Sequence, residues 1–110
     1  MHLIDKDHVG DLDVFHTTTI SANVTGTVTV HDGAELKIVG EIVGNVVVKQ
    51  GGALVLTGRV KGAIVNEGGA VDIFGFVGHV HLDEDADAYV SRGAIIGGER
   101  SSRPRKLSPG

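Results

Sequence analysis

The sequence has no cysteine and few aromatic residues, and both absences narrow what it can do. Without cysteine, the 110-residue chain has no disulfide, thiol nucleophile or thiolate zinc site. Its four aromatic side chains, three Phe and one Tyr, are too few for a core built around rings. No apolar run approaches the ~18 residues of a membrane span, and no signal-peptide pattern opens the chain. We therefore expect a cytoplasmic, single-domain protein with an aliphatic core.

Basic side chains are scarce over most of the chain and gather at its end. Residues 1–99 carry fourteen acidic and six basic side chains, a net charge of −8, whereas residues 100–110 carry four basic and no acidic ones. An acidic body lacks the phosphate-neutralising surface that nucleic-acid binding requires, so we expect no nucleic-acid partner. We predict that residues 99–110, which hold both prolines and show no periodicity, form a disordered basic tail. The positive charge of this tail is the only feature of the sequence that suggests contact with a membrane, through anionic lipid.

Glycine, in contrast, is abundant and marks an internal repeat of eighteen residues. Residues 23–40 (NVTGTVTVHDGAELKIVG) and 41–58 (EIVGNVVVKQGGALVLTG) agree in kind at apolar and glycine positions such as Val24 and Ile42, Gly26 and Gly44. Residues 59–75 are one residue shorter, and residues 76–93 continue in weaker form. Apolar and polar residues alternate within each unit, which predicts β-strands. Such a unit cannot bury its apolar face alone, so we expect the units to stack ~4.8 Å apart around a shared aliphatic column.

The sequence thus predicts an all-β, single-domain parallel β-helix (a solenoid) over residues 23–98, with residues 1–22 as an irregular N-terminal capping segment. Val28 should stack on Val46, and glycines such as Gly44 and Gly62 should lie at bends. Asn66 falls at an inward position of the third coil, where we expect it to hydrogen-bond the backbone of a tight corner. Either Phe76 or Val77 takes the inward place of Val60.

Three motifs resemble the bactofilins, a family of polymer-forming bacterial cytoskeletal proteins, between residues 24 and 98. They are IVGNVVV at 42–48, LTGRVKGAI at 56–64 and VSRGAIIGG at 90–98. The resemblance implies a right-handed β-helix that polymerises end to end without nucleotide, often beneath the membrane. From the residues alone, a left-handed helix of six-residue strands stays open, because inward residues recur every six positions, as Val24, Val30, Leu36, Ile42, Val48, Leu54 and Val60.

The open ends of such a solenoid expose unpaired backbone groups and a slice of the apolar column, so they are candidates for end-to-end association. The candidates at the N-terminal end are Leu12, Val14, Phe15 and Ile20. Those at the C-terminal end are Phe76, Val80, Leu82, Val90, Ile95 and Ile96. The alternative is that these residues complete the core of a capped monomer.

The sides of the solenoid offer two further candidate surfaces. Outward apolar residues one repeat apart predict a lateral binding stripe made of Val39, Val43, Val47, Val55, Val65 and Phe74. An acidic loop (Asp83, Glu84, Asp85 and Asp87) would suit a basic partner surface. His79, His81 and Asp83 alternate along one strand and form a weak candidate metal site, although solvated polar residues explain them equally well. We expect His2, His8, His16 and His31 to face solvent, and Glu41 to pair with Arg59.

The sequence shows no signature of an enzyme and implies no cofactor. Glycine motifs of the nucleotide-binding kind are absent, as is a recognisable Ser/His/Asp or paired-carboxylate arrangement. Our leading hypothesis is a non-enzymatic, bactofilin-like scaffold that self-assembles through its ends and organises other proteins. The alternative is a β-helical binding module, monomeric or dimeric, that inhibits a basic partner protein in the manner of an immunity protein.

Overall fold

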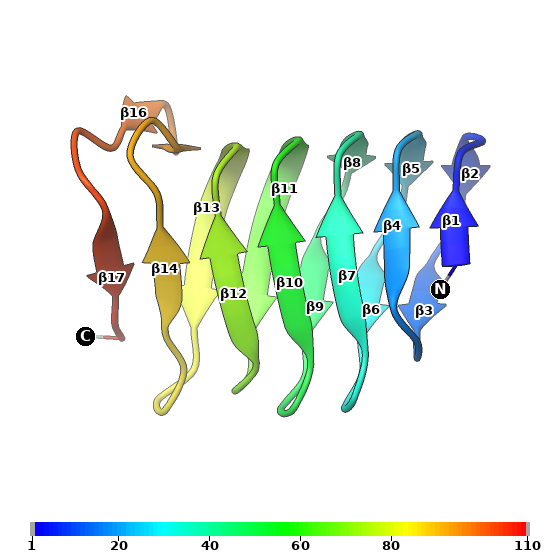
Figure 1. Cartoon of the computed structure of the whole chain (residues 1–110), viewed down its shortest axis with the longest axis horizontal. Helices are drawn as coiled ribbons and strands as arrows, with labels where there is room; N and C mark the ends of the chain where they lie inside the picture. The colour runs from blue at the N-terminus through cyan, green and yellow to red at the C-terminus, as the bar shows by residue number, and fades with distance from the viewer. Residues whose placement is uncertain (1, 110) are drawn as a thin grey trace.

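The computed structural model describes residues 2–109 and shows a β-solenoid of about five turns, with short parallel strands stacked in successive coils (Figure 1). The described chain contains strands and turns but no helix. Each coil contributes a strand to each of three faces. The predicted all-β parallel solenoid is therefore confirmed.

The strands divide among the three faces as follows. The first face holds β1 (His2–Ile4), β4 (Thr18–Ile20), β7 (Glu35–Ile38), β10 (Ala53–Leu56), β12 (Ala70–Ile73), β14 (Ala88–Val90) and β17 (Arg105–Leu107). The second face holds β2 (His8–Val9), β5 (Asn23–Thr25), β8 (Glu41–Val43), the first parts of β11 (Arg59–Asn66) and β13 (Phe76–Leu82), β15 (Ile95–Ile96) and β16 (Glu99–Arg100). The third face holds β3 (Leu12–Val14), β6 (Val28–Val30), β9 (Val46–Val48) and the last parts of β11 and β13.

The pairing register follows the sequence repeat in the middle of the solenoid. Val28 lies opposite Val46, as predicted, and Leu36 lies opposite Leu54, eighteen residues on. The third repeat is one residue shorter, so Leu54 lies opposite Val71, seventeen residues on. Val77, and not Phe76, lies opposite Val60 and is fully buried, which resolves the alternative left open by the sequence.

Inward side chains from all three faces form one aliphatic column along the axis. Its largest fully buried members are Ile20, Leu36, Ile38, Ile42, Leu54, Leu56, Ile64 and Ile73. Burying each such side chain stabilises the fold by roughly 1.5–3 kcal/mol, so this column is its main source of stability. No aromatic ring of residues 2–109 enters the column, consistent with the low aromatic content of the sequence.

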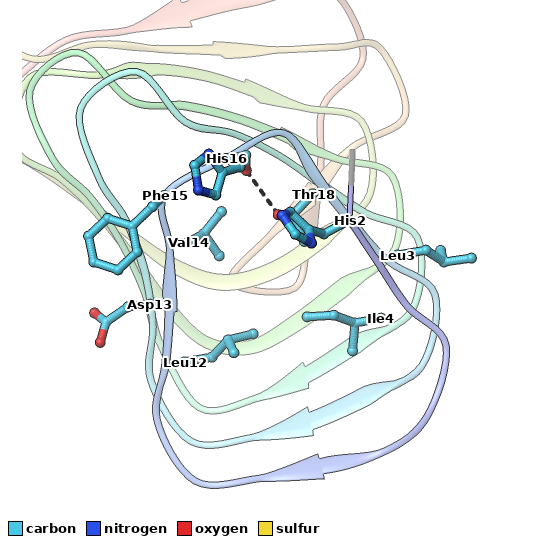
Figure 2. A pocket seen from close by; sticks show the side chains of 9 residues that line it. All are labelled: His2, Leu3, Ile4, Leu12, Asp13, Val14, Phe15, His16 and Thr18. Carbon is cyan, nitrogen blue, oxygen red and sulfur yellow. Dashed lines mark hydrogen bonds between the residues drawn. The ribbon is translucent and has the colours of Figure 1, made fainter.

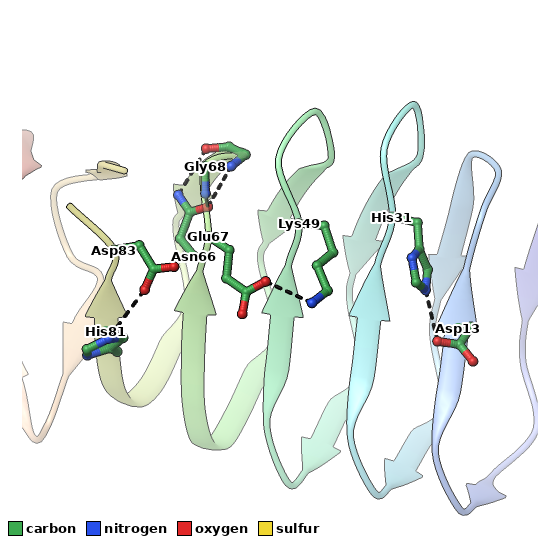
Figure 3. Close-up of polar contacts among 9 residues, drawn as sticks. Asp13, His31, Lys49, Asn66, Glu67, Gly68, His81 and Asp83 are labelled. Atoms are coloured by element: carbon green, nitrogen blue, oxygen red, sulfur yellow. Dashed lines mark hydrogen bonds and ion pairs between the residues drawn. The ribbon is translucent and has the colours of Figure 1, made fainter. Parts of the chain in front are cut away.

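The solenoid winds in the right-handed sense. In Figure 1 the first-face strands run upward on the near side, the chain crosses to the far side at the top, and successive coils advance from right to left. Figure 3, which views the third face, gives the same sense. The right-handed winding implied by the family resemblance therefore describes this chain.

A column of glycines forms the corner between the second and third faces. Gly26 and Gly44 have φ values of +142° and +149°, which side chains rarely adopt. A Cβ on Gly44 would collide with the carbonyl oxygen of Gly26, and one on Gly62 would collide with that of Gly44. Gly62 also marks a shift of register within β11. Close backbone approach therefore requires glycine here, as predicted for Gly44 and Gly62.

Asn66 is fully buried and makes hydrogen bonds to the backbone of the tight corner that follows β11. Its Oδ1 accepts hydrogen bonds from the amides of Gly68 (3.1 Å) and Gly69 (2.8 Å). Its Nδ2 donates to the carbonyls of Gly69 (2.9 Å) and Asp87 (2.6 Å). The side chain therefore completes the backbone hydrogen bonding of a corner shortened by one residue, which confirms the predicted role.

The N-terminal segment is more regular than predicted. Residues 2–14 form a complete first coil, because β1, β2 and β3 pair in parallel with β4, β5 and β6 of the next. This coil is offset by sixteen residues, as in the pairing of His2 with Thr18. The layer expected over residues 1–22 is therefore present but regular where irregularity was expected, because a coil two residues shorter still stacks its inward side chains on the next.

The basic tail, expected to be disordered, is folded over residues 99–107. The chain reverses after β15, so that β16 pairs antiparallel with β15 and β17 pairs antiparallel with β14. Ser101 is buried, and its amide donates to the carbonyl of Ala94 (2.8 Å). These contacts supply partners for the exposed backbone of the last coil, which explains why a polar segment without periodicity is ordered.

Candidate functional site: the two ends of the solenoid

The N-terminal end of the solenoid is an open end. Each of its three strands pairs on one side only: β1 with β4, β2 with β5 and β3 with β6. Among residues 2–109 no strand covers their outer edges. Their outward backbone N–H and C=O groups are therefore available to pair with another strand.

An apolar hollow of about 360 Å³ occupies the centre of this end. Ile4, Leu12 and Val14 project into it, while His2 and His16 lie on its rim with ring centroids 5.5 Å apart (Figure 2). Ile4 and Leu12 are only partly buried, because no coil lies beyond them. The hollow is thus an uncovered slice of the aliphatic column.

Three of the four predicted N-terminal end residues line this hollow, namely Leu12, Val14 and Phe15. Phe15 lies at its margin and projects outward at the corner after β3 (Figure 2). Its ring stacks on His31, with ring centroids 4.3 Å apart and an 11° interplanar angle. Ile20 is fully buried one coil further in, because residues 2–14 supply an additional coil.

The corner after β3 also ties the first coil to the second. His31 Nε2 lies 2.9 Å from Asp13 Oδ1 (Figure 3). The same ring stacks on Phe15. The histidine lies on the outer surface, as expected, but these two contacts leave its side chain only 30% exposed. Lys49 and Glu67 make an equivalent contact between later coils at 2.8 Å.

At the C-terminal end, the reversed chain covers two faces and leaves part of the third open. Beyond Val77, β13 has no partner on its outer side among the described residues, so the backbone of His79–Leu82 is an open edge. Val80, Leu82 and Leu107 line a second depression, of about 410 Å³. The outer edges of β16 and β17 are also unpaired in this part of the chain.

Of the six predicted C-terminal end residues, Val80 and Leu82 lie at this open edge. Val90 is fully buried beneath β17, and Ile95 and Ile96 are partly buried beneath β16. Because the tail folds back, these three residues do not form the outer surface. Phe76 lies on the side of the solenoid.

Phe76 packs against Arg59 on the side of the solenoid and does not lie at the end of the molecule. The guanidinium carbon of Arg59 lies 5.0 Å from the centroid of the Phe76 ring. The predicted pair of Glu41 with Arg59 is therefore not formed, although the two residues are register neighbours. Glu41 Oε1 instead lies 3.2 Å from Lys61 Nζ, an ion pair without hydrogen-bond geometry.

The predicted lateral stripe is divided among different parts of the solenoid. Val47 and Val65 are neighbours on the third face, whereas Val55 lies on the first face and Val43 on the second. Equivalent corner positions carry Val39 and Phe74, 49% and 52% exposed. The six residues therefore do not form one continuous binding stripe, because an eighteen-residue coil turns through three faces.

The acidic loop lies between β13 and β14, with Asp83, Glu84 and Asp85 exposed. The fourth acid, Asp87, is held by Lys106 of the tail at 3.1 Å. Asp83 lies 3.5 Å from His81 (Figure 3). No group of three His or acidic side chains in residues 2–109 is arranged to hold a metal ion, so the weak metal candidate at His79, His81 and Asp83 has no geometric support.

The end residues predicted from the sequence did not include Ile4, Leu107 or the arginines around the last corner. Ile4 could have been found from a sixteen-residue offset, since Ile4 precedes Ile20 by the same interval as Gly10 precedes Gly26. Leu107 packs against the column from a reversed strand, for which the repeat gives no signal.

Comparisons of the chain with protein-family models, curated proteins and solved structures give no match. No helix in residues 2–109 is long and apolar enough to cross a membrane.

Proposed function

We propose that this protein is a non-catalytic, bactofilin-like scaffold of the cytoplasm that associates with copies of itself through the ends of its solenoid. One observation carries the proposal: each of the three faces ends on an unpaired strand edge at both ends of the described chain. Exposed edges of this kind recruit further strands unless they are covered.

The apolar hollow adds a hydrophobic contribution to the backbone pairing. Ile4, Leu12 and Val14 would lose contact with water when another copy covers the N-terminal end. The end face measures at most about 25 by 20 Å, or about 500 Å² for each partner. This is below the roughly 800 Å² for each partner in a typical stable interface, so we expect weak association that depends on concentration.

The sides of the stacked coils would then serve other proteins. Val39, Phe74 and Tyr89 are exposed on the outside, and successive copies would repeat them along an assembly. The resemblance to the bactofilins supports the same role, since it implies end-to-end polymerisation without nucleotide.

Sedimentation velocity from roughly 1 to 500 µM tests the proposal, a range that brackets weak interfaces of this size. We expect the weight-average sedimentation coefficient of the native chain to rise with concentration. Leu12→Lys, which places a charge in the hollow, should abolish the rise. Val43→Lys on the side of the solenoid is the matched control and should keep it. A chain that remains monomeric throughout would contradict the scaffold.

The second candidate, a binding module for a basic partner protein, is favoured by the exposed Asp83, Glu84 and Asp85. Under this hypothesis a lysine-rich peptide would bind the native chain, and the double variant Glu84→Gln/Asp85→Asn would bind it more weakly. Titration calorimetry separates the two functions, because Leu12→Lys should leave peptide binding unchanged. Peptide binding by a strictly monomeric chain would favour the binding module over the scaffold.

A further inference from the structure

The two ends of the solenoid carry opposite charge. The first coil, residues 2–16, has four Asp and one Lys, a net charge of −3 with histidine neutral. The last turn and its cap, residues 92–107, have five basic side chains and Glu99, a net charge of +4. The opposite charges lie at the two extremes of the long axis of the molecule (Figure 1).

At the N-terminal end, two of the acids lie at the corner between the first and second faces. Asp5 and Asp7 flank Lys6 in the turn that joins β1 to β2. Asp5 is exposed, and Asp7 Oδ1 accepts a hydrogen bond from the amide of Asn23 (3.1 Å). We call Asp5 and Asp7 the acidic corner.

At the C-terminal end, four exposed arginines gather where β14 turns into β15. Arg92 and Arg100 line one depression together with Ser101, and Arg100, Arg103 and Arg105 line the adjacent one. The amide of Gly93 donates to the carbonyl of Ser101 (2.8 Å), so the tail lies directly over this corner. We call Arg92, Arg100, Arg103 and Arg105 the arginine corner.

The acidic and arginine corners lie on the same edge of the solenoid. A ladder of backbone hydrogen bonds runs along this edge, each corner amide donating to a carbonyl of the preceding coil. It starts with Ser21 N to Ile4 O and ends with Ser91 N to Ile73 O, at 2.9 and 2.8 Å. A second copy placed along the same axis would therefore bring its acidic corner onto the arginine corner of the first.

The acidic loop favours the same arrangement. Asp83, Glu84 and Asp85 lie at the corner between the third and first faces. The matching corner of the first coil consists of Phe15, His16 and Thr17, which include no acid. Stacking of two copies along a common axis therefore places no acid opposite the acidic loop. Contact between two N-terminal ends would instead bring together two coils that each carry a net charge of −3.

From these charges we infer that copies of this chain stack head to tail, with the acidic corner of one copy on the arginine corner of the next. The inference rests on the proposed end-to-end association and specifies its partner and polarity. The strand edges are compatible with it: β1 and β17 are the two edge strands of the first face, and β2 and β16 are those of the second. A contact between two different surfaces leaves a free surface at each end, so it builds polar filaments and not closed dimers.

Cysteine cross-linking tests the polarity directly, because the native chain contains no cysteine. Asp5→Cys and Arg103→Cys, each on the full chain, are treated with a short thiol-specific cross-linker, separately and as an equimolar mixture. We expect dimers from the mixture at about tenfold or more over either variant alone, since stacking holds the two thiols at a high effective concentration. Asp72→Cys, an exposed acid on the first face, replaces Asp5→Cys as the matched control and should not cross-link to Arg103→Cys above background.

Each other outcome overturns the inference in a distinguishable way. Efficient cross-linking of Asp5→Cys alone would show head-to-head contact, and that of Arg103→Cys alone tail-to-tail contact. Chains that associate in sedimentation but show no excess of mixed dimers would associate by another surface. In all three cases the inferred polarity fails while self-association stands. A mixture that stays monomeric would contradict the proposed scaffold as well.

Charge reversal provides an independent measurement that does not depend on thiol chemistry. Asp5→Arg and Arg103→Asp should each weaken self-association, whereas both substitutions in one chain should restore it, because each end then meets its new complement. Raising the salt from about 50 to about 500 mM should weaken the native association, since exposed charges are screened. Failure of the double variant to recover would contradict the inferred contact.

Discussion

The side-chain amide of Asn66 donates a 2.6 Å hydrogen bond to the carbonyl oxygen of Asp87, which joins the third coil to the acidic loop of the next. The same side chain bonds the backbone of Gly68 and Gly69 within its own corner. A residue whose register neighbours are Val48 and Leu82 thus contributes through polar contacts.

Asn66→Val should destabilise the fold although valine suits the neighbouring inward positions. The change leaves two amides and two carbonyls of the corner without their partner, and buried unsatisfied groups cost about 1–3 kcal/mol each. We expect a loss of at least about 2 kcal/mol in the free energy of unfolding, measured by urea denaturation. Gln50→Ala, at an exposed position, should change it by less than about 0.5 kcal/mol. If Asn66→Val were as stable as the native chain, the hydrogen bonds of Asn66 would not stabilise this corner.

Gly44→Ala should be far more damaging than Gly33→Ala. At Gly44 the new Cβ meets the carbonyl of Gly26, and φ is +149°. At Gly33 φ is +81°, but a Cβ added there would meet no atom within 4 Å beyond the neighbouring residues in the chain, so only the backbone preference is violated. We expect about 1–2 kcal/mol for Gly33→Ala and at least about 3 kcal/mol for Gly44→Ala, from the same denaturation experiment. Similar losses at the two positions would argue against close packing of the glycine column.

Leu107→Asp should release the folded tail. Leu107 packs against the aliphatic column from β17, so a carboxylate there opposes the pairing of β17 with β14. Trypsin should then cleave after Arg105 or Lys106 several times faster than in the native chain, because proteolysis follows the population of the opened segment. Ser108→Asp, at an exposed neighbouring position, is the control and should leave the rate unchanged. Fast cleavage of the native tail would contradict its ordered structure.

The eighteen-residue repeat was sufficient to predict the central coils. Register neighbours such as Val28 and Val46 follow from it, because alternation determines which side chains point inward and the repeat determines which ones stack. The same reasoning placed Asn66 correctly. It gave residues 1–22 only as an irregular layer, because the residues of the first coil match the next at an interval of sixteen and not eighteen, as Leu12 matches Val28.

The candidate surfaces were harder to predict, for two physical reasons. A repeat identifies equivalent positions but not the face on which they lie, so Val43, Val47 and Val55 were grouped although they lie on three different faces. The outer surface of the C-terminal end depends on an antiparallel reversal that no repeat encodes. Val90 therefore lies beneath β17, which covers the backbone edge of β14.

Amide hydrogen exchange measured at low and high protein concentration tests most directly whether the solenoid associates through its ends. We expect protection to increase with concentration in the end strands β1–β3, in His79–Leu82 and in β16–β17, while the central strands such as β9 and β10, already paired on both sides, stay unchanged. Exchange in the end strands that is the same at every concentration would contradict the account.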